Sequence, residues 1–125
     1  NCQNVILTPH IGGSTQEAQF KIGREVSESL DLFFSTGQTM GAVEFPNVPA
    51  SLEIRGRRLL NVHRNVPGVL GDINSIVSQA GINISSQTLS TDEEIGFLLM
   101  DIEAGHNEAF EEISSLSTNI KTRLI

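Results

Sequence analysis

The pattern of hydrophobic and polar positions becomes regular from residue 57 onward. Residues 58–63 and 82–89 have the composition and alternation of strands. Residues 96–103 form a more continuous hydrophobic run, which predicts a buried strand. The polar residues between the last two segments predict a hairpin turn, and residues 119–125 predict a final strand.

Two helices are predicted between these strands. The first opens with Val66, Pro67 and Gly68, and Gly81 is placed just past its end, as proline and glycine favour these positions. The second is expected to begin near residues 105–107. Their hydrophobic positions follow helical spacing: Val69, Leu70, Ile73, Ile76, Val77 and Ala80 in the first, and Ala109, Phe110, Ile113 and Leu116 in the second.

The predicted order is βαββαβ, which indicates an α+β, ferredoxin-like fold. Each right-handed βαβ crossover lays its helix on the same side of the sheet. We therefore expect a four-stranded antiparallel sheet with both helices on one face. Such a fold hosts many functions, so the order alone does not predict an activity.

The first part of the chain predicts a short strand, a loop and a long helix. Residues 4–8 have the composition of a buried strand, followed by Pro9. Ser14 and Glu17 have the spacing of a capping box at a helix start, and Gly37 is placed to end the helix. Its hydrophobic residues are Ala18, Ile22, Val26, Leu30, Phe33 and Phe34, with Phe20 off the stripe. So much apolar surface needs a partner, either another domain or another subunit.

The segment between the two parts predicts a linker. Pro46, Pro49 and Gly56 surround a short extended piece, residues 41–45, for which a strand stays open. The chain therefore divides into residues 1–40, a linker at 41–56, and a domain at 57–125.

Charge and aromatic content narrow the classes of function. Eight Lys and Arg against fifteen Asp and Glu give a net charge of −7, which disfavours a nucleic-acid partner. RNA binding on such a sheet needs stacking aromatic side chains, and Phe97 is the only aromatic residue in the predicted strands. No apolar run approaches the roughly 18 residues of a membrane span, so no membrane partner is expected.

Cysteine usage and the start of the sequence add two expectations. The single Cys2 supports neither an internal disulfide nor a cysteine-based metal site, which fits a reducing cytoplasm, and no metal site is predicted. Residues 1–5 show neither a signal-peptide pattern nor an initiator Met, which indicates a fragment.

Candidate chemistry lies at the corner between the first strand and the first helix of the domain. His63 and Asn65 end the strand, and the helix that follows presents free N–H groups and the positive end of its dipole. Gly68 lets a ligand approach the backbone, and Asn83 offers a donor and an acceptor just beyond the helix. These groups suit a zwitterion. Equally, His63 is a satisfied strand-end residue and Asn65 a cap before Pro67, and the pattern favours neither interpretation.

Two motifs resemble known families. The pattern His63-x-Asn65-x-Pro67-Gly68-Val69-Leu70 resembles the ACT domain, a regulatory module of amino-acid metabolism, and the match covers residues 57–125. Residues 4–18 resemble the segment that ends the cofactor domain of D-isomer-specific 2-hydroxyacid dehydrogenases. Their succession, with residues 42–46 between them, resembles the C-terminal part of the phosphoglycerate dehydrogenase family of the short bacterial type.

The resemblance implies a parent enzyme that oxidises 3-phosphoglycerate to 3-phosphohydroxypyruvate with NAD in L-serine biosynthesis. His10 matches the catalytic histidine, and Gly12 and Gly13 match the turn beside the nicotinamide. The carboxylate that orients this histidine in the family lies upstream, and these 125 residues contain no G-x-G-x-x-G fingerprint. We expect this chain alone to be inactive as a dehydrogenase and not to bind NAD.

For the domain, the resemblance implies L-serine as an effector, with His63, Asn65 and Asn83 as its ligands. The effector lies between two ACT domains that pair edge to edge, Asn83 comes from the partner, and the parent is a homo-oligomer, a tetramer. Serine inhibits by binding the inactive arrangement more tightly. The linker glycine pair of the family is Arg55-Gly56 here, which indicates a stiffer hinge. The alternative is a dimerisation tail that keeps the fold and binds nothing.

Overall fold

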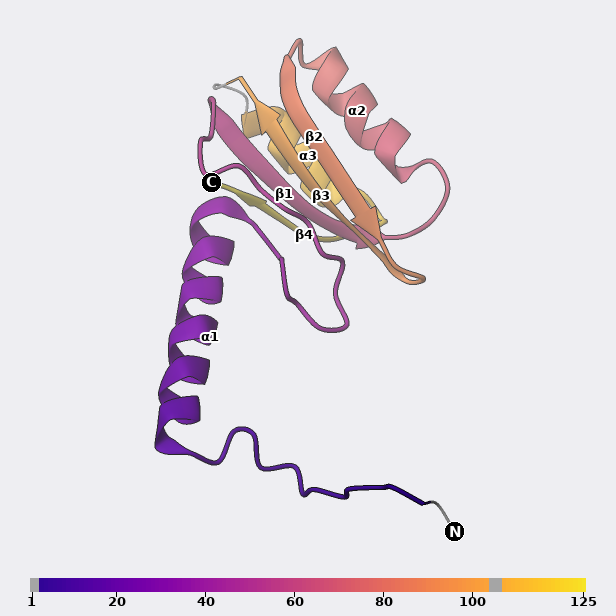
Figure 1. Ribbon diagram of the computed structural model, residues 1–125. Coiled ribbons are helices and arrows are strands. Elements are labelled where there is room, and N and C mark those ends of the chain that lie inside the picture. The colour runs from indigo at the N-terminus through magenta and orange to yellow at the C-terminus, as the bar shows by residue number, and fades with distance from the viewer. Residues whose placement is uncertain (1–2, 104–106) are drawn as a thin grey trace.

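In the computed structural model, which describes residues 3–103 and 107–125, a four-stranded antiparallel sheet carries two helices on one face, and a long helix extends from it (Figure 1). The strands lie in the order β2-β3-β1-β4. The helices are α1 (Gln16–Thr36), α2 (Val69–Gln79) and α3 (Asn107–Ser115), and the strands are β1 (Arg57–Arg64), β2 (Ile84–Thr91), β3 (Ile95–Ile102) and β4 (Asn119–Leu124). The predicted βαββαβ order and ferredoxin-like α+β fold are confirmed.

The main core lies between the sheet and helices α2 and α3. The side chains that meet there are those predicted from the helical and strand periods, and they are fully or almost fully buried: Leu59, Val69, Ile73, Ile76, Val77, Ile82, Leu98, Met100, Ile102, Ala109 and Ile113. Gly68, with φ 98°, is the N-cap of α2, so Pro67 precedes the helix and does not lie in its first turn. The start of α3 predicted near residues 105–106, like Cys2, lies outside the described residues.

The linker covers the other face of the sheet. Val48 is fully buried against Leu60, Phe97 and Leu99, and the Phe45 ring packs edge-on to Phe97 with centroids 5.3 Å apart. Residues 41–45 form no strand. Gly56 has φ 93°, and a Cβ there would lie 3.3 Å from the carbonyl carbon of Ile102, so this linker glycine is held tightly against β3.

Helix α1 ends against the same face of the sheet as the linker. Gly37 caps it in the left-handed conformation, as predicted, with φ 77°. A Cβ on Gly37 would lie 2.8 Å from the side chains of both Leu60 and Leu99, so the backbone itself packs on the sheet there. The helix then leaves the sheet, and its hydrophobic stripe stays exposed at Ile22, Val26, Leu30 and Phe34.

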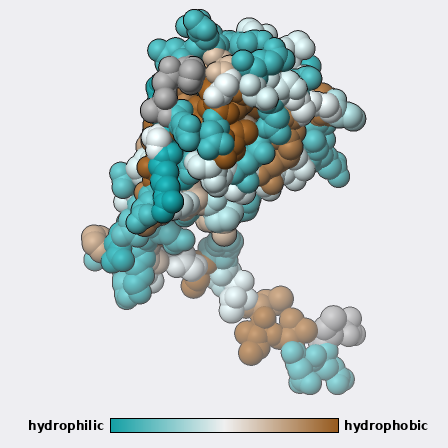
Figure 2. All heavy atoms as spheres, turned by 90° about the horizontal axis from the view of Figure 1, so that it is seen from above, coloured by the Kyte–Doolittle hydropathy of each residue, from teal (hydrophilic) through white to brown (hydrophobic). Residues whose placement is uncertain are grey.

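Two predictions for the first part of the chain are wrong. Residues 4–8 are no buried strand: Ile6 is 90% and Leu7 89% exposed, and Figure 2 shows hydrophobic side chains standing out on this extended segment. A strand needs a hydrogen-bonding neighbour, and none of the strands that the structure describes lies beside it. The cap of α1 is Thr15 and not Ser14, since the Thr15 hydroxyl accepts from the Ala18 N–H at 3.1 Å. No helix in the described ranges is long and apolar enough to cross a bilayer.

Candidate functional site

The polar corner predicted after β1 lies beside the turn between β2 and β3. The Asn65 backbone N–H donates to the Glu94 carbonyl at 2.8 Å, and its side-chain Nδ2 donates to the Asp92 carbonyl at 2.6 Å. The Asn65 side chain is exposed, and no described residue donates to its Oδ1. Asn65 is therefore fixed at the corner with an acceptor directed outward.

The alternative interpretation, in which Asn65 caps α2, is wrong. The N-cap is Gly68, which has no side chain, and no side-chain cap is bonded to the start of the helix. The first N–H groups of α2, which starts four residues after Asn65, therefore have no side-chain acceptor among the described residues. A helix end of this kind attracts a carboxylate.

His63 is the buried member of the corner, with only 3% of its surface exposed. Its Nδ1 lies 2.8 Å from Asn61 Oδ1. The ring lies directly over Gly96, the residue opposite it on β3, where a Cβ would lie 2.8 Å from His63 Cε1. Burial lowers the pKa of His63, so its imidazole is neutral at pH 7.

Asn83 lies at the opposite end of the domain. It precedes the first residue of β2, while Asn65 is bonded to the turn that follows the last residue of β2. An eight-residue strand spans about 26 Å, so the two amides of one chain do not meet. Asn83 Nδ2 donates to Glu103 Oε1 at 3.1 Å, and its side chain lines a shallow groove with Asn74 and Ser78. The structure thus brings His63 and Asn65 together and leaves Asn83 apart.

His10, Gly12 and Gly13 lie in the non-helical segment before α1. His10 and Gly12 are exposed, and the Gly13 carbonyl accepts from the Gln19 side chain. Within the described part of the chain, no carboxylate is hydrogen-bonded to His10. These residues by themselves do not enclose a nicotinamide ring. Among residues 3–103 and 107–125, no group of three or more His, Cys, Asp or Glu side chains is placed to hold a metal ion.

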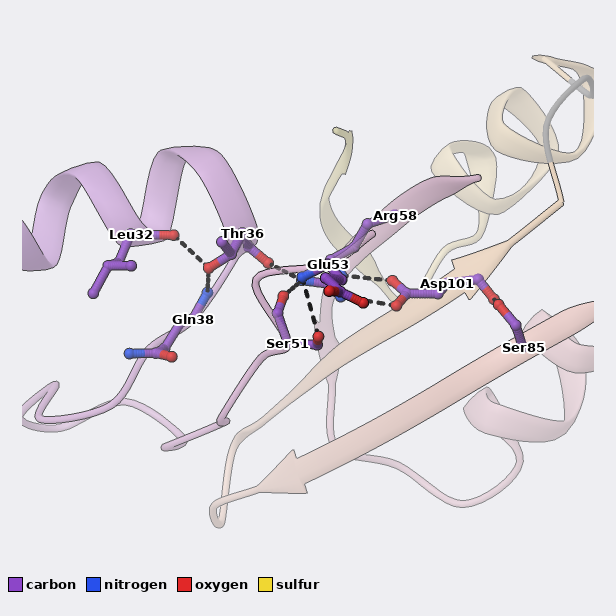
Figure 3. A network of polar contacts seen from close by, with 8 residues as sticks. All are labelled: Leu32, Thr36, Gln38, Ser51, Glu53, Arg58, Ser85 and Asp101. Carbon is purple, nitrogen blue, oxygen red and sulfur yellow. Dashed lines mark hydrogen bonds and ion pairs between the residues drawn. The ribbon is translucent and has the colours of Figure 1, made fainter. Parts of the chain in front are cut away.

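Sequence reasoning missed two polar clusters, one partly buried and one buried. One joins Asn61, Asn119 and Thr122 beside His63. The other is a bidentate ion pair of Arg58 with Asp101, at 2.5 and 2.8 Å (Figure 3). Arg58 Nη1 also donates to the carbonyls of Thr36 at 2.9 Å and Ser51 at 2.8 Å. Arg58 and Asn61 are polar residues next to apolar residues of β1, which is a signal that the sequence offered for these clusters. The partners of each residue depend on the register between strands, which the sequence pattern does not specify.

Comparison with known proteins agrees with this fold. The ACT domain from a GTP pyrophosphokinase of Chlorobium tepidum superposes with a TM-score of 0.50 at 12% identity, over 55% of this chain and 95% of that chain, which supports the fold alone. D-3-phosphoglycerate dehydrogenase of Dictyostelium discoideum is 46% identical over 99% of this chain. The Escherichia coli K12 enzyme of that name is 44% identical over 98%.

The chain spans about 30% of the length of these curated relatives. The resemblance to phosphoglycerate dehydrogenases noted from the motifs is confirmed by their match along nearly the whole chain. The family description "AHAS small subunit-like ACT domain" matches residues 59–121, which hold both covering helices and most of the sheet. The chain therefore belongs to the ACT domain family, whose members are regulatory modules.

Proposed function

We propose that this chain is the L-serine-sensing regulatory part of an NAD-dependent D-3-phosphoglycerate dehydrogenase. In the full-length protein, oxidation of 3-phosphoglycerate to 3-phosphohydroxypyruvate in the cytoplasm would be inhibited by L-serine, the end product. The observation that carries the proposal is the corner of His63 and Asn65 at the start of α2, which has no side-chain cap, in a chain whose relatives are D-3-phosphoglycerate dehydrogenases.

The chemistry of the corner matches a small amino acid. The free N–H groups of α2 and the positive end of its dipole suit the carboxylate. The outward Asn65 Oδ1 is an acceptor for an ammonium group. Both charges of a zwitterion thus find a partner at one end of β1, and an effector with a single charge would leave one group unpaired.

A second copy of the chain completes the proposed site. Strand β2 is an edge of the sheet, with unpaired backbone groups along one side. If two β2 edges pair antiparallel about a two-fold axis, the start of one β2 lies opposite the end of the other. The partner's Asn83 then approaches the corner of Asn65, although the two are about 26 Å apart in one chain. The dimer contains two equivalent sites and assembles further into the tetramer of the parent.

The first 40 residues belong, in this proposal, to the end of the cofactor domain of the parent. His10 would act there as the catalytic acid and base, with Gly12 and Gly13 beside the nicotinamide. The exposure of His10 and Gly12 in this chain fits residues that form a site only with other segments of an enzyme. We therefore expect no dehydrogenase activity from this chain alone.

Isothermal titration calorimetry with L-serine tests the sensor. We expect saturable binding by the wild-type chain, loss of binding in Asn65→Ala and in Asn83→Ala, and normal binding in Asn47→Ala, the same substitution in the linker loop. If the wild-type chain neither releases heat nor gains thermal stability at millimolar L-serine, the sensor is refuted. A dimer in the ultracentrifuge under those conditions would then support the alternative, a dimerisation tail that binds nothing.

Mixing the two variants tests the shared site directly. Each homodimer lacks a necessary amide in both sites, but a heterodimer of Asn65→Ala and Asn83→Ala chains keeps one intact site. We expect the mixture to recover serine binding at up to half of the sites in each heterodimer. No recovery after verified subunit exchange would contradict the placement of Asn83 across the interface.

A further inference from the structure

A chain of hydrogen bonds, buried at His63 and Asn61 and partly buried at Asn119 and Thr122, connects His63 to the end of helix α3. It runs from the Ser114 carbonyl through Asn119 and Asn61 to the imidazole, with Thr122 beside it. Asn61 is 1% and His63 3% exposed. At these two buried residues each donor needs an acceptor, and the Ser114 carbonyl gives the direction of the bonds that lead to them.

The Ser114 backbone carbonyl fixes the first step because it can only accept. Asn119 must therefore direct its Nδ2 to this carbonyl, at 2.9 Å, and its Oδ1 to the opposite side. That Oδ1 accepts from Asn61 Nδ2 at 2.9 Å and from the Thr122 hydroxyl at 2.8 Å. The hydroxyl in turn accepts the second N–H of Asn61 Nδ2 at 2.9 Å. Both donors of Asn61 are thereby used.

The remaining atom of the Asn61 amide is its oxygen, and it faces His63 Nδ1 at 2.8 Å. A carbonyl oxygen only accepts, so the hydrogen of this bond must be on Nδ1. Burial lowers the pKa of His63 and keeps the imidazole neutral near pH 7, so a neutral ring with Nδ1–H has its lone pair on Nε2.

We propose that Asn61 is a positioning residue that holds His63 in the Nδ1–H tautomer, so that Nε2 meets the effector as a hydrogen-bond acceptor. The inference rests on the proposed function, because it assigns a role to His63 in that site. It also restricts the ligand. The group that contacts Nε2 must be a donor, the hydroxyl or ammonium of the amino acid, and the carboxylate is directed elsewhere, to the start of α2.

The position of Nε2 fits this role. It has no hydrogen-bond partner among the described residues, yet no fully buried side-chain nitrogen or oxygen in those residues lacks one. Nε2 therefore keeps some accessible surface, although His63 as a whole is only 3% exposed. The ring can take this position because the residue opposite is Gly96, where any Cβ would overlap it.

Nuclear magnetic resonance of the chain labelled with ¹⁵N-histidine reads the tautomer directly. The chain has three histidines, and His63→Gln identifies the signal of His63. We expect the wild-type chain without serine to show a protonated, pyrrole-type Nδ1 and an unprotonated Nε2. A protonated Nε2 in the neutral ring would overturn the proposal, whatever the affinity for serine. Absence of serine binding with a protonated Nδ1 would refute the proposed function alone.

Variants separate positioning from mere packing. Asn61→Leu removes the acceptor, so we expect the Nε2–H tautomer to appear and serine affinity to fall about tenfold, the size of one lost hydrogen bond. Thr122→Val is the matched control, because it removes a polar group of the same network and leaves the Asn61 oxygen on Nδ1. If Asn61→Leu does not fold, Asn61→Asp keeps an oxygen on Nδ1 and must retain the Nδ1–H form. Loss of that form in Asn61→Asp contradicts the proposal.

Discussion

The Arg58–Asp101 pair allows a quantitative prediction about what holds the linker and α1 to the sheet. The substitution Asp101→Ala leaves the Arg58 guanidinium, 3% exposed, without its counter-charge. Removing one partner of a buried pair typically destabilises by about 3–5 kcal/mol. Arg58 keeps two carbonyl acceptors, Thr36 and Ser51, so we expect the lower end, about 3 kcal/mol. For a chain of this size that lowers the melting temperature by about 10 °C or more.

A smaller loss of stability is expected when both charges are removed. Arg58→Met combined with Asp101→Leu replaces the pair by apolar groups of similar length and leaves no uncompensated charge. The carbonyls of Thr36 and Ser51 lose their donor, so we expect a loss of stability, but a smaller one than in Asp101→Ala. Urea denaturation followed by circular dichroism measures the free energy of unfolding of all three proteins. If Asp101→Ala loses less than about 1 kcal/mol, or the double variant is as unstable as the single one, the pair is not isolated from solvent as described here.

Three further predictions concern single residues. Gly96→Ala should displace the His63 ring and weaken serine binding by about tenfold or more in calorimetry, and an unchanged dissociation constant would contradict the placement of the ring. Thr15→Ala should destabilise α1 by about 1 kcal/mol, measured by amide exchange. An equal effect of Ser14→Ala would contradict Thr15 as the cap and favour the capping box predicted for Ser14 and Glu17. The unfolded chain protonates His63 more readily than the folded chain, so stability should fall as pH drops below about 6.5 and remain full above it. His63→Gln should weaken this dependence in urea titrations at pH 7.5 and 5.5, and an unchanged slope would contradict it.

Periodicity alone predicted the ACT-like sheet and both of its helices, because their residues pack among themselves. Ile73 and Ile113 are fully buried at positions marked by helical spacing. The segment 4–8 has an equally hydrophobic pattern, yet Leu7 is exposed. A hydrophobic pattern indicates that a segment is suited to burial. The segment is buried only if the surface that covers it is present in the structure.

The candidate site was predicted only in part for a related reason. His63 and Asn65 are near neighbours in the sequence, so a motif detects them. The partners of His63 come from β1, β3 and β4, and Asn61 and Asn119 are separated by 58 positions. Such contacts depend on the register between strands, including the irregularity at Val62 and His63, which the sequence pattern does not specify.

Helix α1 is attached to the sheet at one end only, which has a consequence for how movements of the sheet would reach its other end. Its base is held to the sheet by Gly37 and Arg58, while its 21 residues extend for about 31 Å (Figure 1). A tilt of about 5° at this base moves the far end, close to His10, by about 3 Å. A helix of this length that moves as a rigid body would therefore convert a small rotation at the sheet into a displacement of atomic size at its other end.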